Sequence, residues 1–304
     1  MVIAAKVLAD SIAFSTRLVT LEITCPRIIL AEFNTHRAFS RNSASSRAIP
    51  VETRCAVIER EPFVPLAFGK NQRGMQAGEL LDALANATAE AVWREAATDA
   101  VRHARRLAEV GAHKQHANRL AETYAWTTIV VTSTEFDNWR ALRRHADAQP
   151  EIQGLAEAMD AAMEESTPQL LAPGDWHLPY IDWETAGAGH SSEVLRAISV
   201  ARCCAVSYER QGDEKTIDQY QALYLRLLKG GHMSPFEHPA KVVAPVAIAP
   251  ENGEDIYGPP FGVVYTAAPD EQWAIDGYFC GNVRAPFVQL RKFIVGEHVF
   301  QGGQ

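Results

Sequence analysis

An apolar, β-branched run that leads directly into a polar run is the feature that most restricts the fold of this chain. The apolar run covers residues 19–30 (VTLEITCPRIIL), and the polar run covers residues 33–47 (FNTHRAFSRNSASSR). The first run is typical of a strand or of a buried helix, and its periodicity does not decide between them. Either element would deliver the polar side chains that follow it to a single place on the fold.

The polar run is rich in groups that bind phosphates and nucleosides. Arg37, Arg41 and Arg47 carry planar guanidinium groups, which are always charged and suit a phosphate. Serine hydroxyls and the amide of Asn42 can complete hydrogen bonds to a sugar or to a base edge. A solvated polar loop or helix face would have the same composition, so composition alone does not decide between the two.

The overall composition limits the class of partner. The chain has 304 residues, enough for one large domain or two ordinary ones, and its net charge is −8. This charge argues against broad nucleic-acid binding but is compatible with a local cationic pocket for a small anionic substrate. The sequence lacks an 18-residue apolar run and a signal-peptide pattern, so we expect a cytoplasmic protein without a membrane partner.

The cysteines indicate reduced thiols. The count is odd and contains no CxxC pair: Cys25, Cys55, Cys203, Cys204 and Cys280. The vicinal pair Cys203 and Cys204 lies in an apolar stretch and is interpreted as buried core. His232 and His238 have no carboxylate or cysteine at metal-site spacing, so no metal is expected.

The order of predicted elements favours an α+β fold over an alternating βαβ series. Residues 1–32 are predicted to form β segments, with an edge strand or a kink at Pro26, and residues 48–75 are predicted to be loop-like. A helix is predicted at 76–112, ending near Gly111, and a strand or buried helix in 113–135. A second helix is predicted at 136–167, interrupted at Pro150. The second half is predicted to contain a connection or lid at 168–192, apolar structure at 193–209, a helix at 216–229, a strand at 241–249 and a loop-rich region at 250–280. Neither a GxGxxG nor a P-loop motif is present.

Three stretches together carry a family resemblance. In the first, Thr35-His36-Arg37 is followed by Ser40, Asn42, Ser45 and Arg47. The second is His232-Met233-Ser234-Pro235-Phe236-Glu237-His238, with Ala205-Val206-Ser207-Tyr208 before it. The third is Asn138-Trp139-Arg140-Ala141-Leu142-Arg143, followed by Ala148-Gln149-Pro150-Glu151-Ile152. The set resembles the flavin-dependent thymidylate synthases.

The motif order differs from the usual family order. In the family, the Ser-Pro-Phe-Glu-His segment precedes the His-Arg segment, whereas here it follows almost two hundred residues later. The chain therefore resembles a divergent, circularly permuted member, a rearrangement that folds tolerate when the original termini lie close together. The resemblance implies a single α+β domain over residues 1–304, with a mixed or antiparallel sheet packed against long helices and a helical portion at about 76–167.

The resemblance also implies roles for individual residues. The residues expected to bind FAD are His36, Arg37, Asn42, Asn138, Ser207, Ser234 and Glu237. The residues expected to bind the nucleotide are Glu32, Asn34, Ser45, Ser46, Arg47, Arg119 and Arg143. Among these, Arg143 and Ser45 are the catalytic candidates. Ser234 and Glu237 could alternatively form a helix capping box, Arg143 could be an exposed helix arginine, and His36 could be a satisfied loop histidine.

The implied reaction is conversion of dUMP to dTMP, with methylenetetrahydrofolate as carbon donor, reduced FAD as hydride donor and NADPH as reductant. The implied assembly is a homotetramer with the site at subunit interfaces. Departures from the motifs at Thr35, Ser43 and Asp147 keep two alternatives open. One is a flavin-linked dUMP or dCMP hydroxymethylase of the same fold, and the other is a flavin- or nucleotide-binding protein without turnover.

Overall fold

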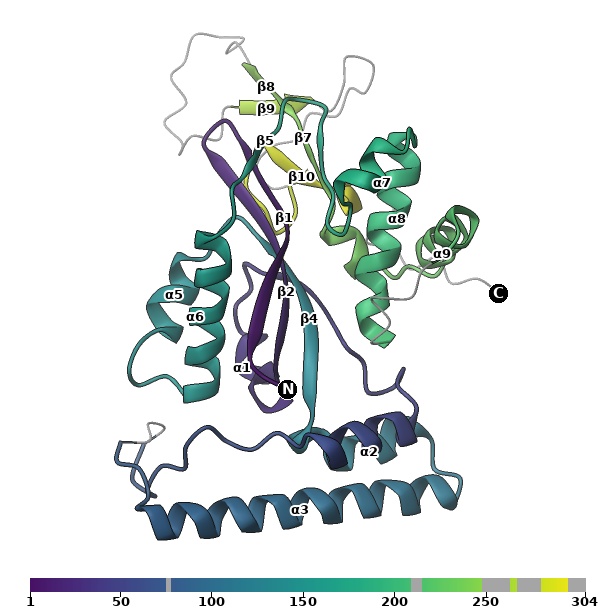
Figure 1. Ribbon diagram of the computed structural model, residues 1–304. Helices are drawn as coiled ribbons and strands as arrows, with labels where there is room; N and C mark the ends of the chain where they lie inside the picture. Colours follow the sequence, from purple (N-terminus) through teal and green to yellow (C-terminus); the bar gives the residue numbers. More distant parts are fainter. Residues whose placement is uncertain (75–77, 209–214, 248–262, 267–279, 295–304) are drawn as a thin grey trace.

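A mixed five-stranded sheet lies at the centre of the fold (Figure 1). The structure is a computed structural model that describes residues 1–74, 78–208, 215–247, 263–266 and 280–294. The sheet has the order β3-β4-β2-β1-β5. Its strands are β1 (Ala4–Ala13), β2 (Thr16–Pro26), β3 (Ser40–Ser43), β4 (Trp126–Ser133) and β5 (Gln169–Leu170). Neighbours pair antiparallel, except that β1 and β5 are parallel.

The apolar run predicted from the sequence forms β2, a central strand whose neighbours are β1 and β4. Of the two alternatives predicted at Pro26, the edge strand is wrong, and the chain instead changes direction there. Pro26 is the last residue of β2, where its missing N–H interrupts no interior part of the ladder. The chain then turns through η1 (Arg27–Ile29) and α1 (Leu30–Phe33) and returns as β3 on the far side of β4. The polar run thus lies at the edge of the sheet.

Helices α5 (Asp137–Arg143) and α6 (Pro150–Glu164) cover one face of the sheet (Figure 1). The predicted helical region at 136–167 is confirmed, and Pro150 occupies the first turn of α6, where its missing N–H is tolerated. The apolar face of α6 packs on alternate residues of β2, such as Leu21 and Ile23, through Leu155 and Met159. Trp139 of α5 extends this core toward Phe33 and Phe39, which flank the polar run.

The opposite face of the sheet carries α8 (Ser192–Ala205) and a buried polar chain. Ser11 Oγ lies 2.8 Å from His177 Nδ1, and His177 Nε2 lies 2.8 Å from Thr20 Oγ1. Thr20 and Thr132 hydroxyls are 2.7 Å apart, and Thr132 Oγ1 lies 2.8 Å from His238 Nδ1. This chain crosses β1, β2 and β4 and ends on the residue after Glu237, so it connects the sheet to the second motif.

Helices α2 (Val51–Arg60) and α3 (Ala83–Glu109) lie across one end of the strands (Figure 1). The loop-like prediction for 48–75 is wrong over α2, because Pro50 stands just before a helix and not within a loop. Cys55 and Ile58 of α2 are buried against Val101 of α3. The predicted helix at 76–112 is confirmed as α3, and Gly111 follows it with a φ of +82°, a conformation that glycine adopts without strain. Two short helices, α4 (Lys114–Ala117) and η2 (Asn118–Tyr124), then lead into β4.

The remaining elements gather around the other end of the sheet and beside α8 (Figure 1). They are β6 (Trp176–His177), α7 (Trp183–Gly187), η3 (Val206–Tyr208), α9 (Ile217–Lys229), η4 (Ser234–Glu237), β7 (Ala240–Val242), β8 (Ala244–Ala247), β9 (Val263–Thr266), β10 (Phe287–Gln289) and η5 (Leu290–Phe293). The predicted helix at 216–229 is confirmed as α9, with Thr216 forming a capping box. Most of the predicted loop-rich region at 250–280 lies outside the described residues. Within the described residues, no helix is long and apolar enough to cross a membrane.

Candidate functional site

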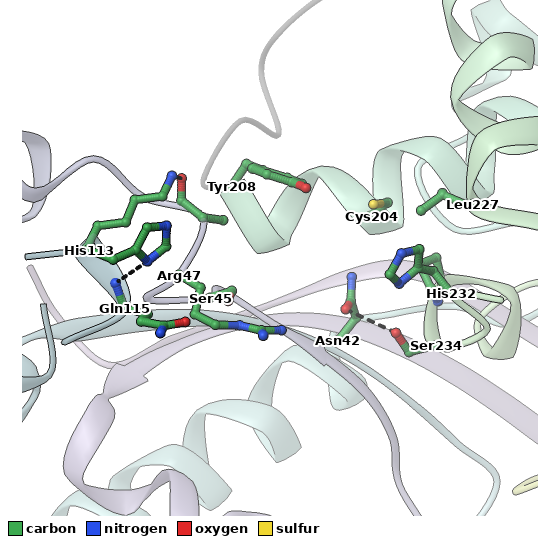
Figure 2. A pocket seen from close by; sticks show the side chains of 13 residues that line it. Asn42, Ser45, Arg47, His113, Gln115, Cys204, Tyr208, Leu227, His232 and Ser234 are labelled. Carbon is green, nitrogen blue, oxygen red and sulfur yellow. Dashed lines mark hydrogen bonds between the residues drawn. The ribbon is translucent and has the colours of Figure 1, made fainter. Parts of the chain in front are cut away.

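Strand β3 is the meeting point of segments that are far apart in the sequence. Asn42 Nδ2 donates a 2.6 Å hydrogen bond to the carbonyl oxygen of Cys203, near the end of α8. Ser234 Oγ, at the start of η4, lies 3.5 Å from Asn42 Oδ1 (Figure 2). The first motif therefore contacts Ser234 of the second motif and the last turn of the helix that leads into Ala205–Tyr208. The alternative capping box at Ser234 is not formed, because Met233 is the N-cap residue of η4 and no side chain caps it.

A pocket of about 510 Å³ opens beside β3 (Figure 2). Its lining residues are Asn42, Ser45, Arg47, Ala48, His113, Lys114, Gln115, Cys204, Tyr208, Leu227, His232, Ser234 and Pro235. One wall carries Arg47 and His113, and the opposite wall carries Asn42, Ser234 and the less polar Cys204 and Leu227. The Arg47 guanidinium is exposed and has no hydrogen-bond or ion-pair partner among the described residues. The pocket thus offers a cationic wall and a mixed wall to one ligand.

The loop that carries Ser45 and Arg47 is held by side chains from other elements. The amide nitrogen of Asn118, a fully buried residue, donates to the carbonyl oxygens of Ser46 (2.8 Å) and Ile49 (2.9 Å). Lys114 Nζ donates to Ala48 O at 2.9 Å. These donors satisfy carbonyl groups that the loop does not pair itself, and so they fix the position of the loop.

Removal of the Asn118 amide should loosen this loop. For Asn118→Ala we expect a loss of about 1–3 kcal/mol in unfolding free energy, because two carbonyl groups lose their donors in a buried place. Urea denaturation followed by circular dichroism measures the change. Asn86→Ala on α3 is the matched control, since the Asn86 side chain forms no hydrogen bond with any residue that the structure describes. Equal denaturation midpoints for the two variants would contradict this role of Asn118.

A second cluster forms around Arg143, at the end of α5. Arg143 Nε donates a 2.9 Å hydrogen bond to His36 Nε2, so the first motif also contacts the third. Burial, together with the positive charges of Arg143 and Arg41, lowers the pKa of His36 to about 4. The ring is therefore neutral at pH 7 and can accept this bond. Its edge contact with Trp139, at a centroid distance of 4.7 Å, holds the ring in place.

Glu237 is engaged by arginine. Its carboxylate accepts a short hydrogen bond from Arg291 Nη1 of η5. Arg41 faces the same carboxylate, which acts to raise the pKa of Arg41, although burial of that guanidinium lowers the pKa overall. Glu237 thus joins the second motif both to residue 291 and to the first motif.

The structure leaves several predicted site residues outside the pocket. Glu32, Asn34, Arg37 and Asn138 are exposed, on α1, on the turn after it and on α5. Ser46 is buried, and its hydroxyl donates to Glu122. The Arg119 side chain is 64% exposed, and its Nη1 lies 3.9 Å from Glu122 Oε2. The side chain of Ser207 lies outside what the structure describes.

Sequence reasoning missed part of the pocket wall. His113, Lys114 and Gln115 line it but belong to none of the three motifs. His232 belongs to the second motif, which assigns it no role, and the apolar stretch around Cys204 predicts only a core residue. Tyr208 also lies in a motif stretch, so membership of a motif is the signal that could identify His232 and Tyr208.

Comparison with known families agrees with the geometry. The sequence model of the family described as thymidylate synthase complementing protein matches residues 12–169, just over half of the chain. The chain belongs to the flavin-dependent thymidylate synthase family. The match contains the first and third motifs of this family, and the Ser234 motif lies beyond it. The fold nevertheless brings Ser234 of that motif against Asn42 of β3.

Solved structures show only a distant likeness to this thymidylate synthase family member. A UMP/dUMP methylase, PolB from Streptomyces cacaoi bound with 5-Br UMP, is 15% identical over 54% of this chain and 89% of that chain, with a TM-score of 0.46. The same protein bound with 5-Br dUMP is also 15% identical, over 54% of this chain and 90% of that chain, with a TM-score of 0.44. Among curated proteins, none matches the chain.

Proposed function

We propose that this protein transfers a one-carbon unit to C5 of a pyrimidine deoxynucleotide in a flavin-dependent reaction that converts dUMP to dTMP. Family membership supports an enzyme that modifies C5 of a pyrimidine nucleotide. The observation that carries the proposal is the convergence of three motifs on residues 36–47. His36 bonds Arg143 of the third motif, and Asn42 contacts Ser234 of the second.

The donor set of the pocket fits a flavin next to a nucleotide. Its volume of about 510 Å³ lies in the range of small-molecule and cofactor sites. Asn42 and Ser234 offer hydrogen bonds beside the less polar surface of Leu227 and Cys204, which suits a flat, partly polar ring. When bound, FAD reduced by NADPH would supply the hydride, and methylenetetrahydrofolate would supply the carbon. Asn42, Ser234 and Glu237 would orient the flavin, with His36, Arg37, Asn138 and Ser207 completing the set.

Ser45 and Arg47 would bind the nucleotide phosphate. Arg47 has no partner among the residues that the structure describes, and the Ser45 hydroxyl lines the same pocket, so a phosphate would receive charge-assisted hydrogen bonds there. Glu32 and Asn34 would contact the nucleotide from the exposed turn before β3.

Loss of the Arg47 charge should weaken nucleotide binding selectively. For Arg47→Met we expect the dissociation constant of dUMP to rise about 10- to 100-fold, which corresponds to the loss of a hydrogen bond to a charged group. The affinity for FAD should change much less. Isothermal titration calorimetry measures both, and Arg106→Met, an exposed arginine of α3, is the control. An unchanged dUMP affinity would place the phosphate elsewhere.

Arg143 would polarise the pyrimidine. Its Nε is committed to His36, while its terminal amino groups have no partner among the described residues. A guanidinium fixed in this way can meet the negative charge that develops on the pyrimidine carbonyls when C5 becomes nucleophilic, with little reorganisation. His36, neutral because its pKa is about 4, orients the guanidinium without competing with it as a charge.

A second subunit would bring the two clusters together. Arg143 does not line the pocket beside β3, and its neighbours Arg37 and Asn138 are exposed. A homotetramer would place the Arg143 cluster of one subunit over the pocket of another, forming a site enclosed from water.

Flavin titration tests the proposed function directly. The absorbance spectrum of purified protein is recorded as FAD is added, and dUMP or dCMP is then added to the complex. We expect bound flavin whose spectrum changes with dUMP, and mass spectrometry of a complete reaction should show a methylated product. A hydroxymethyl product would instead establish the hydroxymethylase, and a failure to bind FAD would reject the proposal.

A further inference from the structure

Gln289 of β10 connects two segments of the site that are distant in the sequence. Its side-chain amide nitrogen donates to Ser40 Oγ at 2.8 Å and to the carbonyl oxygen of Glu237 at 2.6 Å. Its amide oxygen accepts a 3.0 Å hydrogen bond from the backbone N–H of Asn282. The residue is 1% exposed, so its two N–H donors and its oxygen are all satisfied inside the protein.

We propose that Gln289 is a positioning residue that sets the spacing between the β3 segment and the η4 segment of the active site. The consequence for catalysis rests on the proposed function, whereas the consequence for geometry does not. Ser40 stands two residues before Asn42, and Glu237 stands three residues after Ser234, so each bond from Gln289 fixes a segment that carries a pocket residue.

The hydrogen bond between Ser234 and Asn42, which lies beside the Arg41–Glu237 charge pair, is weaker than the link through Gln289. Ser234 Oγ and Asn42 Oδ1 are 3.5 Å apart, at the outer limit of a hydrogen bond, whereas both bonds from the Gln289 amide nitrogen are short. The shorter bonds, made in a buried place, therefore determine how far apart the two segments lie.

A primary amide at this position is chemically specific. One nitrogen with two N–H groups meets two acceptors that belong to different segments, and an oxygen on the same group meets a donor. A carboxylate of the same shape could keep the contacts to the Ser40 hydroxyl and to Asn282 N–H. It would place an oxygen against the Glu237 carbonyl and lose that bond.

The surrounding chain is adapted to hold this amide. Gly281 has a φ of +89°, and a Cβ on it would lie 1.9 Å from Gln289 Oε1, so only glycine leaves room for the side chain. Leu290 N donates to Pro239 O at 2.8 Å, and Arg291 binds the Glu237 carboxylate. Residues 289–291 therefore hold both the main chain of Glu237, through the Gln289 amide, and its side chain, through Arg291.

Hydrogen exchange of the ligand-free protein provides the geometric test. In Gln289→Met, amides of residues 40–43 and 234–237 should both exchange about 10-fold faster or more. In Gln289→Glu only residues 234–237 should lose protection, and in Ser40→Ala only residues 40–43 should. Ser199→Ala is the control, since it removes a buried 2.7 Å hydrogen bond to Pro179 O elsewhere in the fold. Global destabilisation would not produce this split between the two segments. The proposal would be overturned if exchange rose equally in both segments or in neither. If Gln289→Met fails to fold, wild-type exchange rates in Gln289→Glu and Ser40→Ala would overturn it.

Flavin binding then tests the consequence for the site. We expect the FAD dissociation constant of Gln289→Glu to rise about 10-fold, with the dUMP dissociation constant changed less, because Asn118 and Lys114 hold the phosphate loop separately. If the wild-type protein binds no FAD, the proposed function fails, while the exchange pattern still decides the role of Gln289. Equal FAD affinity of Gln289→Glu and wild type would overturn the consequence for the flavin, while the exchange split would still establish that Gln289 sets the spacing of the two segments.

Discussion

Replacement of Arg143 by methionine is expected to lower kcat for methyl transfer by about 10²- to 10³-fold, the usual effect of removing a donor that stabilises transition-state charge. Methionine keeps much of the aliphatic packing but removes the guanidinium that His36 orients. Binding of dUMP should weaken far less than kcat falls, because Ser45 and Arg47 would hold the phosphate. Steady-state kinetics, with product quantified by mass spectrometry, separates the two parameters.

The neighbouring arginine provides the matched control for this experiment. Arg144 lies on the same short segment, but its guanidinium binds Asp160 at 3.1 Å and lies outside the cluster. Arg144→Met should therefore keep kcat within about twofold, while costing at most about 1 kcal/mol of stability. Similar losses of kcat in both variants would mean that Arg143 acts only through the fold.

Mixed assemblies would extend the test to the proposed interface. Arg143→Met and Arg47→Met subunits are each defective in a different cluster, and mixing them restores one intact pair if the clusters belong to different subunits. Recovery of activity on mixing is expected. No recovery from subunits that light scattering shows to have exchanged would contradict a shared site.

Acid should destabilise this protein strongly between pH 6.5 and pH 3. Full burial lowers the pKa of both His177 and His238 to about 3. In the unfolded chain a histidine has a pKa of about 6.5, so below that pH the unfolded state binds protons that the folded state does not bind. The stabilisation is therefore complete above pH 6.5 and is lost as the pH falls. Each histidine contributes about 1.4 kcal/mol per pH unit, and the pair costs about 4 kcal/mol at pH 5.

Single substitutions assign this slope to the buried pair. Urea unfolding at several pH values should show that His177→Gln lowers the acid slope by about 1.4 kcal/mol per pH unit, even if it lowers stability at pH 7.5. The exposed His145 is the control, and His145→Gln should leave the slope unchanged. His36, whose pKa is about 4, adds a third contribution that both variants retain. An unaltered slope in His177→Gln would contradict a neutral, buried His177.

Much of the sheet and most of the long helices could be predicted from the sequence. The helical periodicity of α9 is a local pattern that the structure follows, and the β-branched run left open between strand and buried helix forms the strand β4. Helix α2 escaped prediction because prolines on both sides obscured it, and its stability comes from packing on α3 rather than from its own sequence. The central position of β2 depends on pairing with β4, a hundred residues later.

The site could be predicted only as far as its motifs reach. His36, Asn42 and Ser234 are expected in the site because of the family resemblance, but the contacts of their motifs with one another depend on tertiary structure. Ser46 points toward the partly exposed Glu122 carboxylate, a contact between residues 76 positions apart that the motif alone does not indicate. His113 to Gln115 reach the pocket because α4 follows α3 back toward β3, and nothing in their own sequence indicates it.

The link through Gln289 also has a consequence for synthesis on the ribosome. Ser40 leaves the ribosome some 249 residues before the glutamine that binds it, after the strands and helices of the central sheet have already been made. The nascent chain can therefore form its sheet early, yet the pocket wall cannot reach its final spacing until β10 emerges. Premature termination between η4 and β10 would release a chain in which Ser40 and the Glu237 carbonyl lack this link.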